Sequence, residues 1–215
     1  MWFELPNAPA NWVPAARHLS RVDPKLARII RGVGPCTLAP RRDYYPTLCK
    51  AIFNQQISTK VAAVLFRRFR NEFPGRKPTP THFLASHKRD PEILRRCGLS
   101  RQKAAYLIDL SEHFIANRIP TRKLSRMTDE QVIETLVAVK GVGQWTAEMF
   151  LMFVLNRPDV LPVDDLGLRE GVREIYNLPA RPTPKQLTAM AEPWRPFRSV
   201  ATWYVWRRGL AEKKA

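Results

Sequence analysis

The sequence predicts an all-α protein, and two observations support that prediction. Apolar residues recur at three- to five-residue steps through most of the chain, which is the periodicity of a helix with one buried face. No run of alternating β-branched residues indicates a strand. The chain has 215 residues, of which 45% are hydrophobic, so it carries enough apolar surface to bury a core.

The first clear helical pattern runs from Leu48 to Phe69. Its apolar residues lie over a polar face, and Ser58 stands where it can cap a second helix. We therefore expect two short helices that meet near Gln56–Ser58.

Capping residues mark the elements that follow. Asp90 and Pro91 have the pattern of an N-cap and first helical residue, and Gly98 is expected to stop that short helix. Ser100 is expected to cap the next helix, which should run to a stop near Pro120.

Two glycines separate the next pair of helices. Thr128 and Gln131 form a capping-box pattern ahead of an apolar helix, which is expected to stop at Gly141. Gly143 follows after one residue, and a second apolar helix begins at once. The glycines permit a tight turn and keep side chains out of the way, so the first N–H groups of the second helix can face a phosphate. Taken alone, the pattern also fits an ordinary connection between two helices.

The net charge points to an anionic partner. With 36 Lys and Arg against 19 Asp and Glu, the formal charge is +17, and the basic residues are spread along the chain. Nucleic acid is the favoured partner because Lys and Arg that neutralise phosphates release counterions. Plain solubility and an anionic membrane surface remain alternatives.

Several classes of protein are disfavoured. The cysteines, Cys36, Cys49 and Cys97, are odd in number and far apart, which argues against a disulfide framework, a four-cysteine zinc site or an iron–sulfur cluster. The longest apolar run, Met149–Leu155, falls far short of the roughly 20 residues of a membrane helix. The first residues lack the basic start of a secretory signal. We therefore expect a cytoplasmic protein without membrane contact.

Four stretches of the chain carry a family resemblance. They are Ile52–Ser58, the hairpin Gly141–Ala147, Leu161–Leu166 and Trp194–Ser199. In this order they resemble the helix-hairpin-helix DNA glycosylase superfamily, and within it the 3-methyladenine DNA glycosylase II (AlkA-like) branch. The resemblance covers roughly residues 15 to 209.

The resemblance implies a two-lobed helical fold with the active site in the cleft between the lobes. Residues 40–157 would form a central helical bundle that contains the hairpin at about 129–154. Residues 1–39 and 158–215 would form the second lobe from both termini.

The resemblance also implies a catalytic carboxylate. Asp165 occupies the position of the family's essential aspartate, on the loop after the hairpin. A cationic purine leaves without much acid help, so one carboxylate can suffice to stabilise the electron-poor sugar. Asp164 would cap the following helix, Leu166–Tyr176, or hold Asp165 in place. The alternative is a plain helix start, where acidic residues suit the helix dipole.

Three residues are implied in binding the flipped base, namely Trp145, Met149 and Trp206. Trp145 stands where bifunctional members carry a nucleophilic lysine, so the resemblance implies hydrolysis without lyase activity. Its indole face would attract a cationic purine. These tryptophans could equally fill the core.

The remaining implied contacts are with DNA and a cation. Gln56 would enter the duplex, although it could also be a polar residue that satisfies backbone groups at a helix junction. The hairpin would bind phosphate through Gly141, Gly143, Gln144 and Thr146. Main-chain carbonyls would hold a monovalent cation, and no other cofactor is expected; these carbonyls belong to Val137, Val139 and Val142.

Together these features predict a monomeric, monofunctional DNA glycosylase of base excision repair in a bacterial cytoplasm. It would flip and excise alkylated, cationic purines such as 3-methyladenine from double-stranded DNA. Two alternatives stay open. One is a glycosylase for another lesion, such as hypoxanthine, an etheno adduct, uracil or an oxidised base, and the other is a DNA-binding module without catalytic activity.

Overall fold

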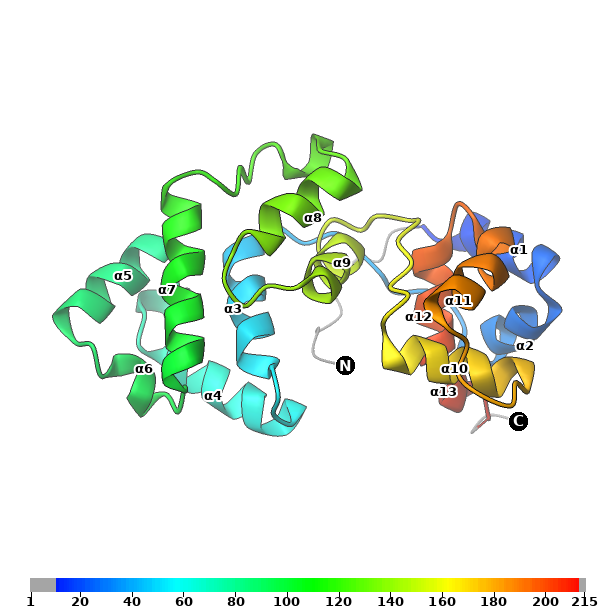
Figure 1. Ribbon diagram of the computed structural model, residues 1–215, viewed down its shortest axis with the longest axis horizontal. Helices are drawn as coiled ribbons and strands as arrows, with labels where there is room; N and C mark the ends of the chain where they lie inside the picture. The colour runs from blue at the N-terminus through cyan, green and yellow to red at the C-terminus, as the bar shows by residue number, and fades with distance from the viewer. Residues whose placement is uncertain (1–10, 213–215) are drawn as a thin grey trace. The chain divides into compact units, whose positions relative to one another are not determined.

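The computed structural model describes residues 11–212, and no strand occurs among them. The predicted all-α class is therefore confirmed. The described chain divides into two compact units, residues 42–150 (the central unit) and residues 11–41 with 151–212 (the terminal unit). Figure 1 shows both units. The sequence places the corresponding boundaries near residues 40 and 157. Among the described residues, no helix has the length and apolar character that crossing a membrane requires.

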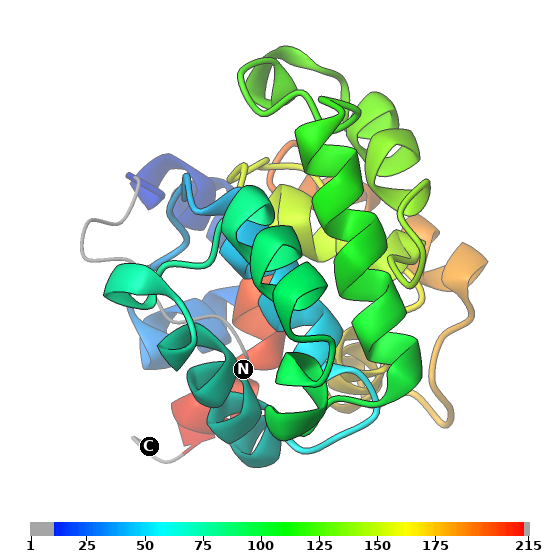
Figure 2. The same ribbon diagram turned by 90° about the vertical axis from the view of Figure 1, so that its left-hand side faces the viewer.

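The central unit is built from helices that pack around α3 and α7. The helix α3 packs on α4 and α7, and α5 packs on α7; α5 and α7 lie side by side at the front of Figure 2. The last helix, α9, contains the boundary between the units. The elements are α3 (Tyr44–Asn54), α4 (Thr59–Asn71), η1 (Pro74–Arg76), α5 (Pro80–Arg89), α6 (Ile93–Arg96), α7 (Arg101–Ile115), η2 (Leu124–Arg126), α8 (Asp129–Val137) and α9 (Gln144–Phe153).

The predicted caps of three helices are confirmed. The hydroxyls of Ser58 and Ser100 each accept a backbone N–H in the first turn of the helix that follows, at 3.3 Å. Thr128 and Gln131 form the complete reciprocal capping box ahead of α8. The sequence therefore locates the starts of α4, α7 and α8 correctly.

The short helix after Asp90 begins later than its residues predict. The Asp90 side chain accepts the N–H of Glu92, but α6 begins only at Ile93, so Pro91 lies outside the helix. The side chain closes a turn of its own before the helix starts. Gly98 does stop the segment, with a φ of +86°.

An aromatic cluster forms the core of the central unit. Phe53, Phe66, Phe69, Phe73 and Phe83 are all buried, and their neighbouring rings lie 5.0–6.1 Å apart between centroids. Burial of each side chain contributes about 1.5–3 kcal/mol. The cluster includes the end of α3, so the loop after α3 starts from a rigid base.

The terminal unit joins the two ends of the described chain. The helix α2 packs on α1, α12 and α13, and α10 packs on α12. The elements are α1 (Val13–Val22), α2 (Pro24–Val33), α10 (Leu166–Tyr176), α11 (Pro184–Met190), η3 (Glu192–Trp194), α12 (Arg198–Trp206) and α13 (Arg208–Glu212).

A buried carboxylate fixes the terminal unit. Asp23 caps α2 by accepting the N–H groups of Lys25 and Leu26, and its second oxygen accepts the Tyr176 hydroxyl and the Trp194 indole N–H. Because these donors come from three elements, one side chain joins α2 to α10 and η3. Such a satisfied buried network also makes the packing of these elements specific.

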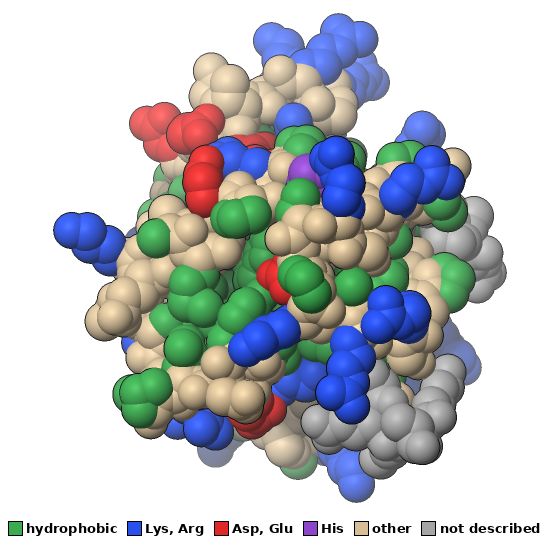
Figure 3. All heavy atoms as spheres, turned by 90° about the vertical axis from the view of Figure 1, so that its right-hand side faces the viewer, with side chains coloured by type: hydrophobic (Ala, Val, Ile, Leu, Met, Phe, Trp, Pro, Cys, Tyr) green, Lys and Arg blue, Asp and Glu red, His purple; other side chains and the backbone are tan. Residues whose placement is uncertain are grey.

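Charged groups on the surface of the terminal unit form ion pairs. Glu170 accepts hydrogen bonds from Arg173 and Arg181, which lower its pKa to about 2. On the face that Figure 3 shows, Lys and Arg side chains are scattered, with acidic side chains between them, and they do not form one patch. On this face the positive charge is therefore dispersed.

Candidate active site

The turn between α8 and α9 depends on a glycine. The helix α8 ends at Val137, four residues before the predicted stop, because three-residue turns take over. Gly141 adopts a φ of +81°, and a Cβ at this position would lie 2.1 Å from the Tyr106 ring. Its carbonyl accepts the side-chain N–H of Gln55 at 2.7 Å. Conformation and close packing therefore both require glycine here.

The start of α9 is open on its outer side. A Cβ at Gly143 would meet no atom within 4 Å, and Gly143 and Gln144 are both exposed. The first N–H groups of a helix have no acceptor within the helix, so they are available to an anion that approaches the glycine. The side chain of Thr146 is largely buried, so its backbone N–H is the group that could serve there. The Gln144 side chain donates to Glu148 at 3.1 Å.

The loop between α3 and α4 presents Gln56 to solvent. The loop lies near Gln56–Ser58, as the sequence predicts, and Gln56 is exposed with a φ of +57°. A left-handed backbone is unfavourable for a residue with a side chain, so surrounding contacts must impose it. The contact from Gln55 to Gly141 joins this loop to the hairpin.

Asp165 is held by two donors. It is the N-cap of α10, where Oδ1 accepts the N–H of Leu168 at 2.6 Å and the indole Nε1–H of Trp206 at 2.9 Å. The capping role predicted for Asp164 is therefore wrong, because the neighbouring carboxylate is the one that reaches the first turn, while Asp164 is exposed. The carboxylate of Asp165 is half-buried and fixed in orientation.

The ring of Trp206 is fixed as well. It stacks on Phe153 with 5.8 Å between centroids and 15° between planes. Asp165 and Trp206, which the resemblance assigns to different roles, are thus in direct contact within the terminal unit.

The loop before Asp165 is tied to the start of α12. Asp159 accepts hydrogen bonds from Arg195 and Arg198, and the Ser199 hydroxyl accepts the N–H of Val160 at 2.9 Å. These contacts give the Trp194–Ser199 stretch a structural role. They fix the loop that delivers the carboxylate.

This arrangement matches a known family. The family model described as "HhH-GPD superfamily base excision DNA repair protein" matches residues 49–196, which is more than half of the chain. The chain belongs to the HhH-GPD superfamily. The predicted resemblance to its 3-methyladenine glycosylase branch is also confirmed by the relatives below.

Relatives of the chain carry consistent names. DNA-3-methyladenine glycosylase 1 of Schizosaccharomyces pombe is 38% identical over 88% of this chain and 84% of its own length. DNA-3-methyladenine glycosylase 2 of Escherichia coli is 29% identical over 73% of this chain and 55% of its own length. The solved S. pombe 3-methyladenine DNA glycosylase, in complex with abasic DNA, superimposes with a TM-score of 0.80 and 36% identity, covering 91% of this chain and 96% of that one.

The two remaining residues predicted to bind the base differ in exposure. Both lie on α9 of the HhH-GPD chain. Trp145 is 39% exposed, so part of its ring is available to a ligand. Met149 is only 2% exposed and packs as a core residue in this structure. Their roles toward a base stay predictions.

The carbonyl site for a monovalent cation also stays a prediction. The carbonyl of Val139 accepts the N–H of Val142 at 3.0 Å. A carbonyl oxygen has a second lone pair, so this bond leaves capacity for a cation. The side chains of Val139 and Val142 are buried, whereas Val137 is 44% exposed.

Four residues that support the site escape sequence reasoning. Gln55 and Lys103 hold the Gln56 loop, and Tyr106 packs against the hairpin glycine. Asp109 accepts the backbone N–H of Lys140, next to that glycine, at 2.8 Å. Each contact joins residues more than 30 positions apart, so no local pattern marks it. The one local signal for Gln55 is that it is adjacent in sequence to Gln56, the residue predicted to enter the duplex.

Proposed function

We propose that this protein is a monofunctional DNA glycosylase that hydrolyses the N-glycosidic bond of alkylated, cationic purines in double-stranded DNA. The observation that carries the proposal is the Asp165 carboxylate, which Leu168 N–H and Trp206 Nε1–H hold in a fixed orientation. It lies on the loop that follows the hairpin in a chain of the HhH-GPD superfamily.

The chemistry needs one carboxylate. An alkylated purine that already carries a positive charge is a good leaving group, so the bond to the sugar breaks with little acid assistance. Positive charge then develops on the sugar, and a pre-oriented carboxylate stabilises it without reorganisation. In this proposal Asp165 supplies that negative charge and guides the attacking water.

The absence of a nucleophilic lysine at Trp145 supports hydrolysis. Lyase chemistry in the family uses a lysine at this position to attack the sugar, and an indole cannot do so. The exposed part of the Trp145 ring instead offers a π face to a cationic base, an attraction worth roughly 0.5–2 kcal/mol. Met149 and Trp206 are likewise proposed to contact the base.

Duplex binding is proposed to use the two exposed turns of the central unit. The hairpin at Gly141 and Gly143 would bind the phosphate backbone, helped by the first turn of α9 and a monovalent cation. Gln56 would fill the gap that the flipped nucleotide leaves. We also propose that the enzyme is a monomer and that it acts in the cytoplasm. Free cysteines such as those of this structure are typical of a reducing compartment.

The test is to identify what the protein releases. Duplex DNA treated with a methylating agent is incubated with the protein, and every purine set free is identified by mass spectrometry. We expect 3-methyladenine and other cationic purines, with intact abasic sites in the DNA and no adduct trapped by borohydride. Release of only uncharged bases, such as hypoxanthine or uracil, would favour the other glycosylase class. No release at all, with DNA binding retained, would identify a binding module.

A further inference from the structure

The loop that carries Gln56 is held in an unfavourable conformation. A φ of +57° lies in the left-handed region, which costs a residue with a side chain free energy relative to right-handed conformations. This energy must be offset by contacts of the neighbouring residues. The structure shows which contacts these are.

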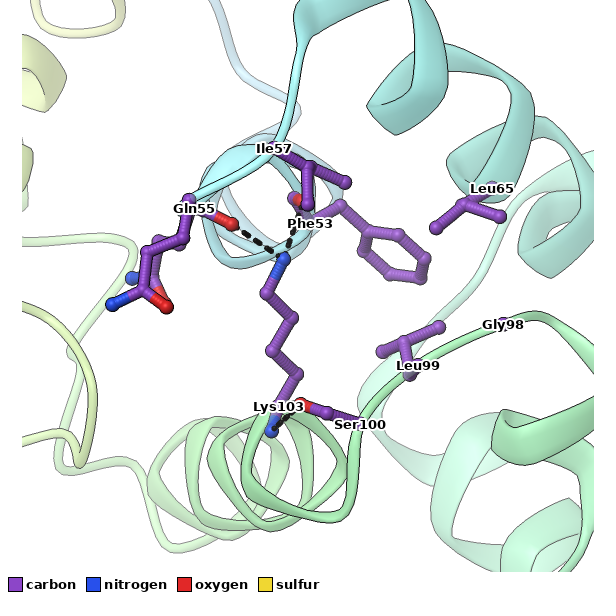
Figure 4. Close-up of a pocket in the computed structure, with 9 residues that line it drawn as sticks. Phe53, Gln55, Ile57, Leu65, Gly98, Leu99, Ser100 and Lys103 are labelled. Carbon is purple, nitrogen blue, oxygen red and sulfur yellow. Dashed lines mark hydrogen bonds between the residues drawn. The ribbon is translucent and has the colours of Figure 1, made fainter.

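The loop lies beside a hollow, so few side chains pack against it on that side. A hollow of about 220 Å³ lies against the loop, lined by apolar side chains such as Phe53, Leu65 and Leu99. Figure 4 shows the loop at one edge of this hollow and the start of α7 at the other. The position of the loop therefore depends on hydrogen bonds that cross the edge of the hollow.

Lys103 makes those bonds. Its Nζ donates to the carbonyl of Phe53 at 2.9 Å and to the carbonyl of Gln55 at 2.7 Å, as the dashed lines in Figure 4 mark. Carbonyls at the end of a helix have lost their intrahelical donors, and a lysine ammonium suits them in charge and geometry. Partial burial lowers the pKa of Lys103. The ammonium thus faces the protein, where it bonds α7 to the end of α3.

A second bond joins the same loop to the hairpin. The Gln55 side chain donates to the Gly141 carbonyl at 2.7 Å. Gln55 is therefore bound to α7 through its backbone carbonyl and to the hairpin through its side chain. The hairpin in turn rests on α7 through Tyr106 and Asp109. One helix therefore supports both turns.

We propose that Lys103 and Gln55 are positioning residues that hold the Gln56 loop and the hairpin in one fixed register. The inference rests on the proposed function, because it assigns the loop to insertion and the hairpin to phosphate binding. Phosphate contacts set where the protein sits on the duplex. A loop fixed to the same frame then meets the DNA stack at a defined distance from those phosphates.

A direct contact between Lys103 and a phosphate is the competing explanation. It predicts a different dependence on salt, because each neutralised phosphate changes the slope of log K against log salt by about 1. A positioning residue leaves that slope unchanged and alters insertion alone.

The experiment measures insertion without chemistry. Lys103→Met and Gln55→Ala are made in an Asp165→Asn background, and each protein is bound to a duplex with 2-aminopurine opposite an abasic site. We expect Lys103→Met to reduce the equilibrium constant for insertion about tenfold or more, as loss of a charged hydrogen bond predicts, with unchanged salt slope.

Two control variants accompany this measurement. Lys103→Arg keeps two donors and should restore insertion. Lys88→Met is the matched control for charge, because it removes an exposed lysine whose side chain makes no hydrogen bond within residues 11–212.

Two further measurements keep the result interpretable. Thermal melting of each variant separates loss of fold from loss of positioning, and amide exchange at residues 55–58 should accelerate in Lys103→Met. Undiminished insertion in Lys103→Met, or a salt slope reduced by about 1, would overturn the inference. If the unmodified protein releases no purine while insertion still depends on Lys103, the proposed function fails and the positioning role stands. If release occurs and Lys103→Met inserts normally, the positioning role alone fails.

Discussion

The Trp206→Phe substitution tests how the carboxylate is held. Phenylalanine keeps an aromatic ring for the stack on Phe153, at 5.8 Å between centroids, and removes only the Nε1–H that reaches Asp165 Oδ1 at 2.9 Å. A hydrogen bond to a charged group contributes about 1.5–3 kcal/mol, and we take the lower end because the site is half-exposed. If this stabilisation acts on the transition state, excision slows roughly tenfold.

The assay is single-turnover release of a methylated purine with enzyme in excess over duplex. DNA affinity should stay within about twofold, because phosphate contacts dominate it. Trp203→Phe is the matched control on the same helix, since its buried indole N–H has no hydrogen-bond partner among the described residues. Full-rate excision by Trp206→Phe, or an equal loss in Trp203→Phe, would refute the role assigned to this bond.

Three further predictions concern the hairpin, the base-binding site and acid stability. Gly141→Ala should lower the free energy of unfolding in urea by at least about 2 kcal/mol, because a positive φ and the Tyr106 ring both oppose a Cβ. Gly143→Ala should lower it by under about 1 kcal/mol, yet weaken duplex binding in a fluorescence titration. Trp145→Ala should slow release of cationic purines while nonspecific affinity measured by the same titration stays near normal, and unchanged turnover would remove Trp145 from the site. Glu170 has a folded pKa of about 2 against an ordinary 4.5, so its contribution to stability is present above pH 4.5 and lost as the pH falls toward 2. The stability of Glu170→Gln, measured against pH, should lack this loss. Identical stability-against-pH curves for the variant and the wild type would contradict the prediction.

Local residues made much of the fold predictable. Serine and threonine caps mark the starts of α4, α7 and α8, because the side chain that satisfies the first N–H groups lies within three residues of them. The hairpin was predictable because Gly141 and Gly143 interrupt two apolar helical segments, and the structure gives Gly141 the positive φ that such a turn uses. Helix ends were less predictable. The helix α8 stops four residues early in three-residue turns, where the Lys140 N–H bonds to Asp109 on α7.

The site was predictable as far as motifs reach. Asp165 stood out by its position after the hairpin, but the sequence could not tell which of two adjacent aspartates caps α10, since both are suitable residues. The bond from Trp206 joins residues 41 positions apart, and that from Lys103 to Gln55 joins residues 48 apart. Such contacts are decided by packing, which a single sequence does not display.

The central claim is that the charge of Asp165 drives excision, and Asp165→Asn isolates that charge. Asparagine is a good N-cap whose amide oxygen can accept the same two N–H groups, so the fold and DNA affinity should be preserved. In single-turnover release from methylated duplex, we expect Asp165→Asn to be slower by about 10²–10³-fold or more, with Asp164→Asn, the exposed neighbour, near the wild-type rate. Equal rates for Asp165→Asn and the wild type would contradict the account.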